Sequence, residues 1–307
     1  YGAKFPAKYQ NAFFISDWSY GKLYAVHLTP KGSSYVGKVE EFASAQPFPL
    51  TDLLVNPKDG AMYIAVGGRK VQSGIYRVTY EGKESIAPAK SIPGGEEARK
   101  RRQGLESFVQ REAKPANKNQ LNKIWNSLAA QDRGIRHAAR VALEKQPIKN
   151  WKSRIASEKS PIIASAAMIA LARADAKSCA PVLQKAMTFK YRDLQSRQQK
   201  LDLLRSITLA LTRGGDPGKE QKQKLIAWLD QIYPASTPEE NRDLSAIMQF
   251  LQAPSAARKG MALLRSASGQ EEQIGYALNL RHLKTGWTSL LRESYFKWFI
   301  RAGNFKG

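Results

Sequence analysis

The chain has 307 residues, of which 42% are hydrophobic, so it is long enough for two domains and apolar enough to bury a core. Its one cysteine, Cys179, excludes an internal disulfide, a four-thiolate zinc site and a C-x-x-C-H haem attachment within these residues. The net charge is +23, and no apolar run of about 18 residues, the length that spans a membrane, is present.

Six short β segments are predicted in residues 1–84. They alternate apolar and polar residues, and Gly, Pro, Asn or Asp separates most of them. Two of them, within LLVNPKDGAMYIAVGG, are expected to form a hairpin with Asp59-Gly60 at its turn. Short antiparallel strands at this pitch are typical of a β-sandwich or of propeller blades. In a propeller these residues amount to about one and a half four-stranded blades, the C-terminal part of the whole.

Residues 85–95 contain Pro and Gly and are predicted to link the β part to a helical part, residues 96–307. A cluster of basic residues lies at the start of the first helix expected in this part. Positive charge there opposes the helix dipole, although Glu96 and Glu97 partly offset it. The cluster is a candidate contact for an anion, and contact with an acidic rim of the β part is the equal alternative. Its four residues are Arg99, Lys100, Arg101 and Arg102.

The segment from Asp132 to Gln146 is the clearest helix. Asp132 is predicted to cap it, because its carboxylate can accept the free N–H groups of the first turn. A narrow, mostly alanine stripe recurs at helical spacing: Ile135, Ala138, Ala139, Ala142 and Leu143. Three basic residues fall outside this stripe and are expected in water, as candidates for anion or partner binding: Arg133, Arg136 and Arg140.

A second apolar stripe, between Leu121 and Ala129, precedes this helix and predicts an αα-hairpin that needs stacked neighbours. About eleven helices are expected in residues 96–307, in hairpins of roughly 35 to 45 residues, which is typical of HEAT-like repeats. The predicted fold is therefore a β + α multidomain chain, in which a partial β-propeller precedes a HEAT-like α-solenoid.

The basic excess belongs to the helical part. Residues 1–90 hold 11 basic and 7 acidic side chains, whereas the remainder holds 38 basic and 19 acidic ones, a net +19. Such a surface attracts nucleic acid, anionic lipid, polysaccharide or an acidic partner protein. The charges are spread along the helices, so a solvated face that aids solubility is an equal alternative.

Four stretches together resemble a known family: FPAKYQNAFFISDWSYGKLYAVHL, PLTDLLVNPKDGAMYIAVGGRKVQSGIYRVTYEG, DRGIRHAARVALEKQP and YALNLRHLKTGWTSLLRESYFKWFIRAGNFKG. They are similar to large exported bacterial proteins of the planctomycete–verrucomicrobial type. Members join a β-propeller like that of soluble glucose/sorbosone dehydrogenases to HEAT-like repeats and usually then to a c-type cytochrome module. The resemblance covers nearly the whole chain, but the earlier blades and the haem motif are absent from it.

The resemblance implies a membrane-associated or periplasmic parent protein that oxidises sugars or alcohols and passes electrons to the fused cytochrome. It implies pyrroloquinoline quinone, calcium and haem c as cofactors of the full-length parent, with none held by this chain alone. The remaining blades and the cytochrome module are then its partners, and residues 96–307 act as spacer and docking scaffold. The chain alone is expected to be inactive, and no catalytic residue is assigned. The rival hypothesis is a basic HEAT-repeat protein that binds nucleic acid or another polyanion.

Candidate cofactor contacts occur at strand ends in the β part. Carboxylates there can bind calcium or polarise a sugar hydroxyl, but more often they cap a turn. The GGRK loop is either a tight turn with positive φ or a basic loop that meets an anionic cofactor such as a quinone carboxylate. The candidates are Asp17, Asp52, Arg69 and Lys70. No P-loop, G-x-S-x-G or H-E-x-x-H motif is present, and the three histidines lie far apart, so no metal site is predicted.

Overall fold

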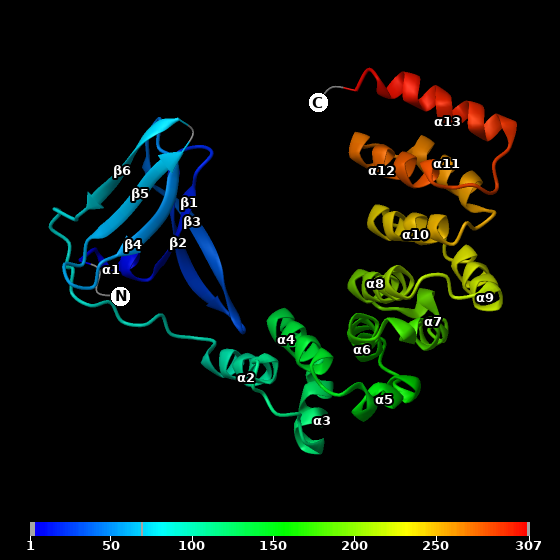
Figure 1. The fold of residues 1–307 in the computed structure, drawn as a ribbon, viewed down its shortest axis with the longest axis horizontal. Helices are drawn as coiled ribbons and strands as arrows, with labels where there is room; N and C mark the ends of the chain where they lie inside the picture. The colour runs from blue at the N-terminus through cyan, green and yellow to red at the C-terminus, as the bar shows by residue number, and fades with distance from the viewer. Residues whose placement is uncertain (1–3, 69, 306–307) are drawn as a thin grey trace. The chain divides into compact units, whose positions relative to one another are not determined.

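The computed structural model describes residues 4–68 and 70–305. The chain divides into two compact units, residues 1–104 and 105–307 (Figure 1). The division falls inside helix α2, after the predicted linker of residues 85–95.

Two three-stranded antiparallel sheets make up most of the first unit (Figure 1). Their orders are β1-β2-β3 and β4-β5-β6, so each is a meander of consecutive strands. The six predicted β segments are therefore confirmed, while their assignment to propeller blades stays a prediction. The strands are β1 (Ala12–Asp17), β2 (Lys22–Lys31), β3 (Ser34–Ser44), β4 (Leu50–Val55), β5 (Met62–Gly68) and β6 (Val71–Val78), and a short helix, α1 (Ala7–Gln10), precedes them.

The predicted β4–β5 hairpin is confirmed, because the two strands pair antiparallel from Val55 opposite Met62. At its turn Gly60 has a φ of 70°, a conformation that suits glycine, and the Asp59 carboxylate accepts the Ala61 N–H at 3.0 Å. The core of the unit draws on both sheets, which are thus packed together at one cluster. It comprises Phe5, Leu23, Leu50, Met62, Ile64 and Val66.

Among the described residues, twelve α-helices follow residue 95, against about eleven predicted. α2 (Glu96–Glu106) spans the division between the units. The second unit contains α3 (Lys118–Ser127), α4 (Arg133–Glu144), α5 (Lys152–Ser157), α6 (Pro161–Ala174), α7 (Cys179–Ala186), α8 (Arg197–Gly214), α9 (Lys219–Asp230), α10 (Pro238–Phe250), α11 (Ala256–Ser266), α12 (Gln270–Arg281) and α13 (Ser289–Ala302). Short 3₁₀ helices lie at Ser107–Val109, Ile148–Asn150, Ala176–Ser178 and Tyr191–Asp193.

The helices of the second unit pack in two layers. Helices α4, α6, α8, α10 and α12 contact one another in that order and form one layer, and the helices between them in sequence lie on the other side (Figure 1). This is the packing expected of stacked αα-hairpins, because each hairpin buries its apolar faces against the next one. The finer assignment to HEAT-like repeats stays a prediction.

Helix α4 has the predicted cap and the predicted alanine stripe. The Asp132 carboxylate accepts the Ile135 N–H at 2.9 Å, as expected of an N-cap. Ala139 and Ala142 are completely buried. Small side chains at these positions let α3 and α6 approach α4 closely on that face.

We expect Asp132→Ala to lower the free energy of unfolding by about 1 kcal/mol, because it removes the acceptor of the Ile135 N–H. Asp132→Asn keeps an acceptor at the same place and should lose much less. Urea denaturation followed by circular dichroism measures both. An equal loss in the two variants would show that the charge, and not the capping hydrogen bond, stabilises the start of α4.

Candidate functional site

The two candidate carboxylates of the β unit, Asp17 and Asp52, accept hydrogen bonds from nearby backbone N–H groups. The Asp17 carboxylate accepts the N–H groups of Ser19 and Tyr20 at 2.9 and 3.0 Å, and Asp52 accepts that of Leu53 at 2.7 Å. The Asp17 contacts agree with the turn-capping alternative, whereas Asp52 lies within β4, opposite Ala65, and not at the strand end where it was predicted, because β4 already begins at Leu50. Lys70 is exposed and has a φ of 59° in the turn between β5 and β6. Arg69 lies outside the described residues.

The described residues of the β unit do not gather the candidate carboxylates into a metal-ligand cluster. Within residues 4–68 and 70–305, no group of three or more His, Cys, Asp or Glu side chains is placed to hold a metal ion. Asp17 and Asp52 each use an oxygen on backbone N–H groups. A role for pyrroloquinoline quinone, calcium or haem c therefore stays a prediction about the parent protein.

The basic cluster at the start of α2 is partly used within the first unit. The Arg99 guanidinium lies 4.9 Å from the ring centroid of Tyr35 on β3, and its Nη2 lies 3.7 Å from Glu96 Oε1. Its side chain is only 16% exposed. Cation–π stacking of this kind ties the start of α2 to the β2–β3 hairpin. Lys100 and Arg101 are exposed and Arg102 is half-buried, so only part of the predicted cluster faces solvent.

A groove along α4, α6 and α8 brings together the other predicted basic residues. It encloses a hollow of about 410 Å³, which is within the usual range for a small-molecule or peptide site. α4 supplies its basic wall, α6 its apolar floor and α8 its opposite wall. The groove is lined by Leu128, Arg133, Arg136, His137, Arg140, Ile162, Ala166, Ile169, Gln198 and Asp202. We call it the α4–α8 groove.

Arg136 is held rigidly at the mouth of this groove. Its Nη1 donates to the carbonyl oxygens of Ala130 and Gln131, both at 2.7 Å. Those carbonyls belong to the turn that joins α3 to α4, so the arginine braces the hairpin. It is half-buried, and not in water as predicted, because that turn lies beside it. The guanidinium donates through one nitrogen here and keeps further N–H groups for a ligand.

Arg140 is also half-buried, in contrast to the prediction. It pairs with Glu144 one turn along α4, and Glu144 in turn pairs with Arg173 of α6 at 3.0 Å. Arg140 Nη2 lies 3.3 Å from His137 Nδ1. Because arginine can only donate, that histidine nitrogen is the acceptor. Arg133 is exposed, as expected, so the α4 wall has one open cation and two that are held in place.

Asp202 faces this basic wall from α8. Burial raises the pKa of its carboxyl group, and the Gln198 amide, which donates to Asp202 at 2.8 Å, and the charge of Arg136 oppose that rise. Asp202 was not predicted as a site residue, because only the packing of α8 on α6 brings it to the groove. A groove with cations on one side, apolar side chains below and a carboxyl opposite favours a ligand that is both anionic and apolar.

A second polar cluster lies in the β unit, beside a hollow of about 490 Å³. His27 Nε2 lies 2.6 Å from Glu40 Oε2, and Tyr9 donates to Glu40 Oε1 at 2.8 Å. These hydrogen bonds, that of His27 first, lower the pKa of Glu40 to about 2. Neither Glu40 nor His27 is among the residues predicted as cofactor or anion contacts. The register of β2 and β3 places Glu40 opposite Ala25, so Glu40 and His27 are diagonal neighbours on the same face of the sheet.

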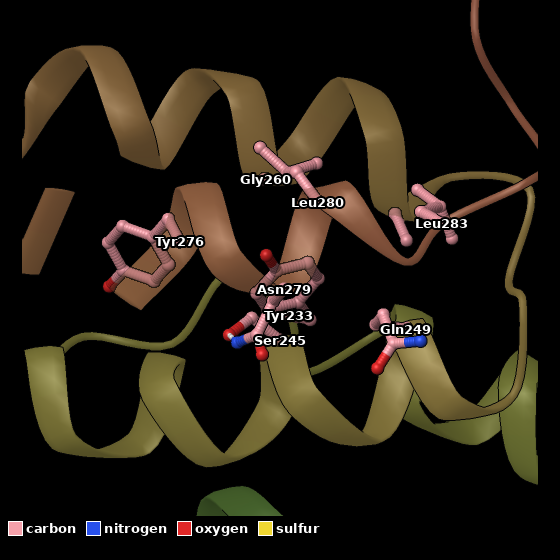
Figure 2. Close-up of a pocket in the computed structure, with 9 residues that line it drawn as sticks. Tyr233, Ser245, Gln249, Gly260, Tyr276, Asn279, Leu280 and Leu283 are labelled. Carbon is pink, nitrogen blue, oxygen red and sulfur yellow. Dashed lines mark hydrogen bonds between the residues drawn. The ribbon is translucent and has the colours of Figure 1, made fainter. Parts of the chain in front are cut away.

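A third cavity lies between α10, α11 and α12, and Figure 2 shows eight labelled residues that line it. Its volume is only about 10 Å³, roughly the space that one water molecule requires. Asn279 donates to the Ser245 hydroxyl at 2.7 Å across it. The cavity is thus a packing feature with a polar pair in it, and it is too small for a substrate.

Comparisons with known proteins identify no relative. No protein-family model, no curated protein and no solved structure matches this chain. The family resemblance therefore stays a prediction, and the functional argument rests on the α4–α8 groove.

Asp202→Asn tests the electrostatics of the groove. The pKa of Asp202 is raised from its ordinary value of 3.8, so its carboxyl group holds a proton more tightly in the folded state than in the unfolded state. The free energy of unfolding therefore falls as pH rises above that value. The variant lacks this ionisation. We expect it to be more stable than wild type at pH 7, by a fraction of a kcal/mol because the carboxyl is partly solvated, with the difference vanishing below pH 4.

Asp216→Asn is the control of opposite sign for that measurement. The Gly218 N–H and Lys222 hold the pKa of Asp216 below its ordinary value, so its charged form stabilises the folded state above that value. This variant should be less stable than wild type at pH 7, and the loss should disappear as pH falls. Denaturation midpoints at several pH values measure both. If the difference in free energy of unfolding between Asp202→Asn and wild type did not change with pH, the burial of this carboxyl would be contradicted.

Proposed function

We propose that the second unit is a docking scaffold that binds an anionic, partly apolar segment of a partner in the α4–α8 groove. The observation that carries this proposal is the convergence of Arg133, Arg136 and Arg140 on a hollow of about 410 Å³. Arg136 is already fixed by two backbone carbonyls, so it loses little side-chain entropy when a ligand binds. Arginine side chains also match carboxylate and phosphate groups in a bidentate geometry.

The apolar floor favours an acidic peptide over a nucleic acid duplex. Ile162, Ala166 and Ile169 of α6 line the groove and are half-buried, so a ligand with apolar side chains can cover them. Arg173 is the only charged residue of α6, and it pairs with Glu144. The basic residues of α4 therefore do not continue across α6 as the uninterrupted stripe that phosphate contacts along a duplex require.

Binding of nucleic acid or acidic polysaccharide remains the alternative function, supported by the net +19 of residues 91–307. It differs from the first proposal in its dependence on salt. Polyanion binding that rests on phosphate contacts weakens steeply as salt rises, whereas a ligand that also covers the α6 floor keeps part of its affinity.

For the first unit, the dehydrogenase hypothesis stays a proposal about the parent protein. One observation supports its structural part, namely that large apolar side chains are exposed on both sheets. Leu54 and Ile75 are 65% and 77% exposed, and Phe13 is 59% exposed. Neighbouring propeller blades would cover such residues, because blades pack their sheets against one another. Limited proteolysis of longer and shorter versions of the protein tests whether added β sequence protects these strands.

Arg133→Ala tests the docking scaffold. We expect it to weaken binding of a fluorescein-labelled acidic peptide with interspersed leucines by about fivefold, roughly 1 kcal/mol, because one unbraced cation is lost. Asp202→Asn should tighten binding, because it removes the carboxyl that lines the groove opposite the basic wall. Fluorescence anisotropy at low and moderate salt measures both.

Arg192→Ala is the matched control, because Arg192 is exposed and does not line the groove. It changes the net charge as Arg133→Ala does and should leave the peptide affinity nearly unchanged. An equal effect of the two variants would show that binding depends on overall charge and not on the groove. Tighter binding of a duplex oligonucleotide of equal charge, lost with salt, would favour the alternative function.

A further inference from the structure

Helix α13 has two apolar faces, and one of them anchors it to the rest of the second unit. Tyr295 and Trp298 are buried on this inner face. The Tyr295 hydroxyl donates to the Ala277 carbonyl at 2.9 Å, and Trp298 Nε1 donates to Gln273 Oε1 at 2.9 Å. Both acceptors belong to α12, so the orientation of α13 about its own axis is fixed by these hydrogen bonds.

The outer face of α13 is also apolar, but it is exposed. Ile300 is 78% exposed, Phe296 65% and Phe299 47%. At 3.6 residues per turn, positions 296, 299 and 300 fall within one arc of about 100° beside the inner face, and the Phe299 ring at the edge of this arc contacts Tyr295 and Trp298, with ring centroids 5.0 Å apart in both cases. Leu290, in the first turn, is 71% exposed. Large apolar side chains gathered on one exposed face mark an interaction surface more often than single ones do.

Basic residues are interspersed with these apolar side chains along α13. Arg292, Lys297 and Arg301 are all exposed. The one acidic residue of the helix, Glu293, pairs with Lys297 at 2.6 Å. The exposed side of α13 therefore combines a net positive charge with large apolar side chains. This is the composition of helices that lie in the interface of an anionic membrane, with their aromatic and aliphatic side chains among the acyl chains and their cations at the headgroups.

We propose that α13 binds the surface of an anionic lipid membrane through Phe296, Phe299 and Ile300. At about 1.5 Å per residue its 14 residues measure about 21 Å, so it lies along the surface and does not cross it. No helix among the described residues is long and apolar enough to span a membrane. A second copy of the chain fits this face less well, because two-fold packing would bring the cations of one α13 toward those of the other.

This surface is separate from the α4–α8 groove, since no residue of α13 lines that groove. The membrane proposal and the docking proposal therefore stand or fall independently. Variants of one site also serve as folding controls for the other.

The test is co-sedimentation of the full chain with vesicles of equal parts phosphatidylglycerol and phosphatidylcholine, compared with vesicles of phosphatidylcholine alone. We expect binding to the anionic vesicles only. The double variant Phe296→Ser/Ile300→Ser keeps every charge and should bind them at least tenfold more weakly. Ile274→Ser/Leu278→Ser, which removes two exposed apolar side chains of α12, should bind like wild type.

Three outcomes would overturn the proposal. One is unchanged binding of the Phe296→Ser/Ile300→Ser variant, which would show that vesicle binding rests on the general positive charge. Another is no binding to anionic vesicles by a folded wild-type chain, as judged by circular dichroism. The third is dimerisation through this face, seen in light scattering as a dimer of the wild type that the double variant abolishes, without vesicle binding.

Discussion

The last carbonyl groups of a helix have no hydrogen-bond partner within that helix. In the second unit, lysine side chains of the next hairpin donate hydrogen bonds to such carbonyls in two places. Lys185 Nζ donates to the carbonyls of Ala156 and Glu158 at 3.1 and 2.6 Å. Lys259 Nζ donates to those of Asp230 and Tyr233 at 2.8 and 2.7 Å. In both cases the lysine reaches a carbonyl 29 residues earlier in the chain. The same contact thus recurs at an equivalent place in two hairpins, and it fixes how each hairpin stacks on the one before.

This constraint changes the meaning of the basic excess. Part of the net +19 of residues 91–307 serves as internal donors, because Lys185, Lys259 and Arg136 each satisfy carbonyls of another helix or turn. Only cations beyond these contribute to an anion-binding surface. Arg136 is such an internal donor and also lines the groove, since the contact that braces the α3–α4 turn holds its guanidinium there. Overall charge is therefore a weaker guide to function than the places where individual cations are held.

The sequence predicted most of the local structure, because local structure follows from local chemistry. The six strands follow from alternation and turn residues, and Asp59-Gly60 and Asp132 act as the turn and the cap that their side chains favour. The environment of Arg140 was predicted wrongly, since a partner on its own helix, Glu144, and a third residue from α6, Arg173, draw it out of water. The Arg140–Glu144 pair can be read from the sequence as an i, i+4 pair, but the Glu144–Arg173 pair depends on which helices stack.

The same limit explains why the candidate site was predicted only in part. The three arginines of α4 were found because they lie outside the apolar stripe of a clearly amphipathic helix. Asp202 was missed, since a carboxylate on an amphipathic helix looks the same whether it meets water or another helix. In the β unit, the contact between Glu40 and His27 was missed for a similar reason. The pairing of β2 with β3 brings His27 Nε2 within 2.6 Å of Glu40 Oε2, and that pairing is not visible in the sequence of either strand.

Side-chain size explains why a groove opens between α4 and α8 and not between α10 and α12. At the latter place Tyr233 and Tyr276 fill the space, and only about 10 Å³ remains. Between α4 and α8 the floor includes Ala166, which is too short to reach either wall. The arginines above it cannot fill the space either, because their charged ends require polar partners or water. The hollow of about 410 Å³ is therefore a place that the side chains lining it leave open, and its lining matches a ligand that is anionic at one side and apolar beneath.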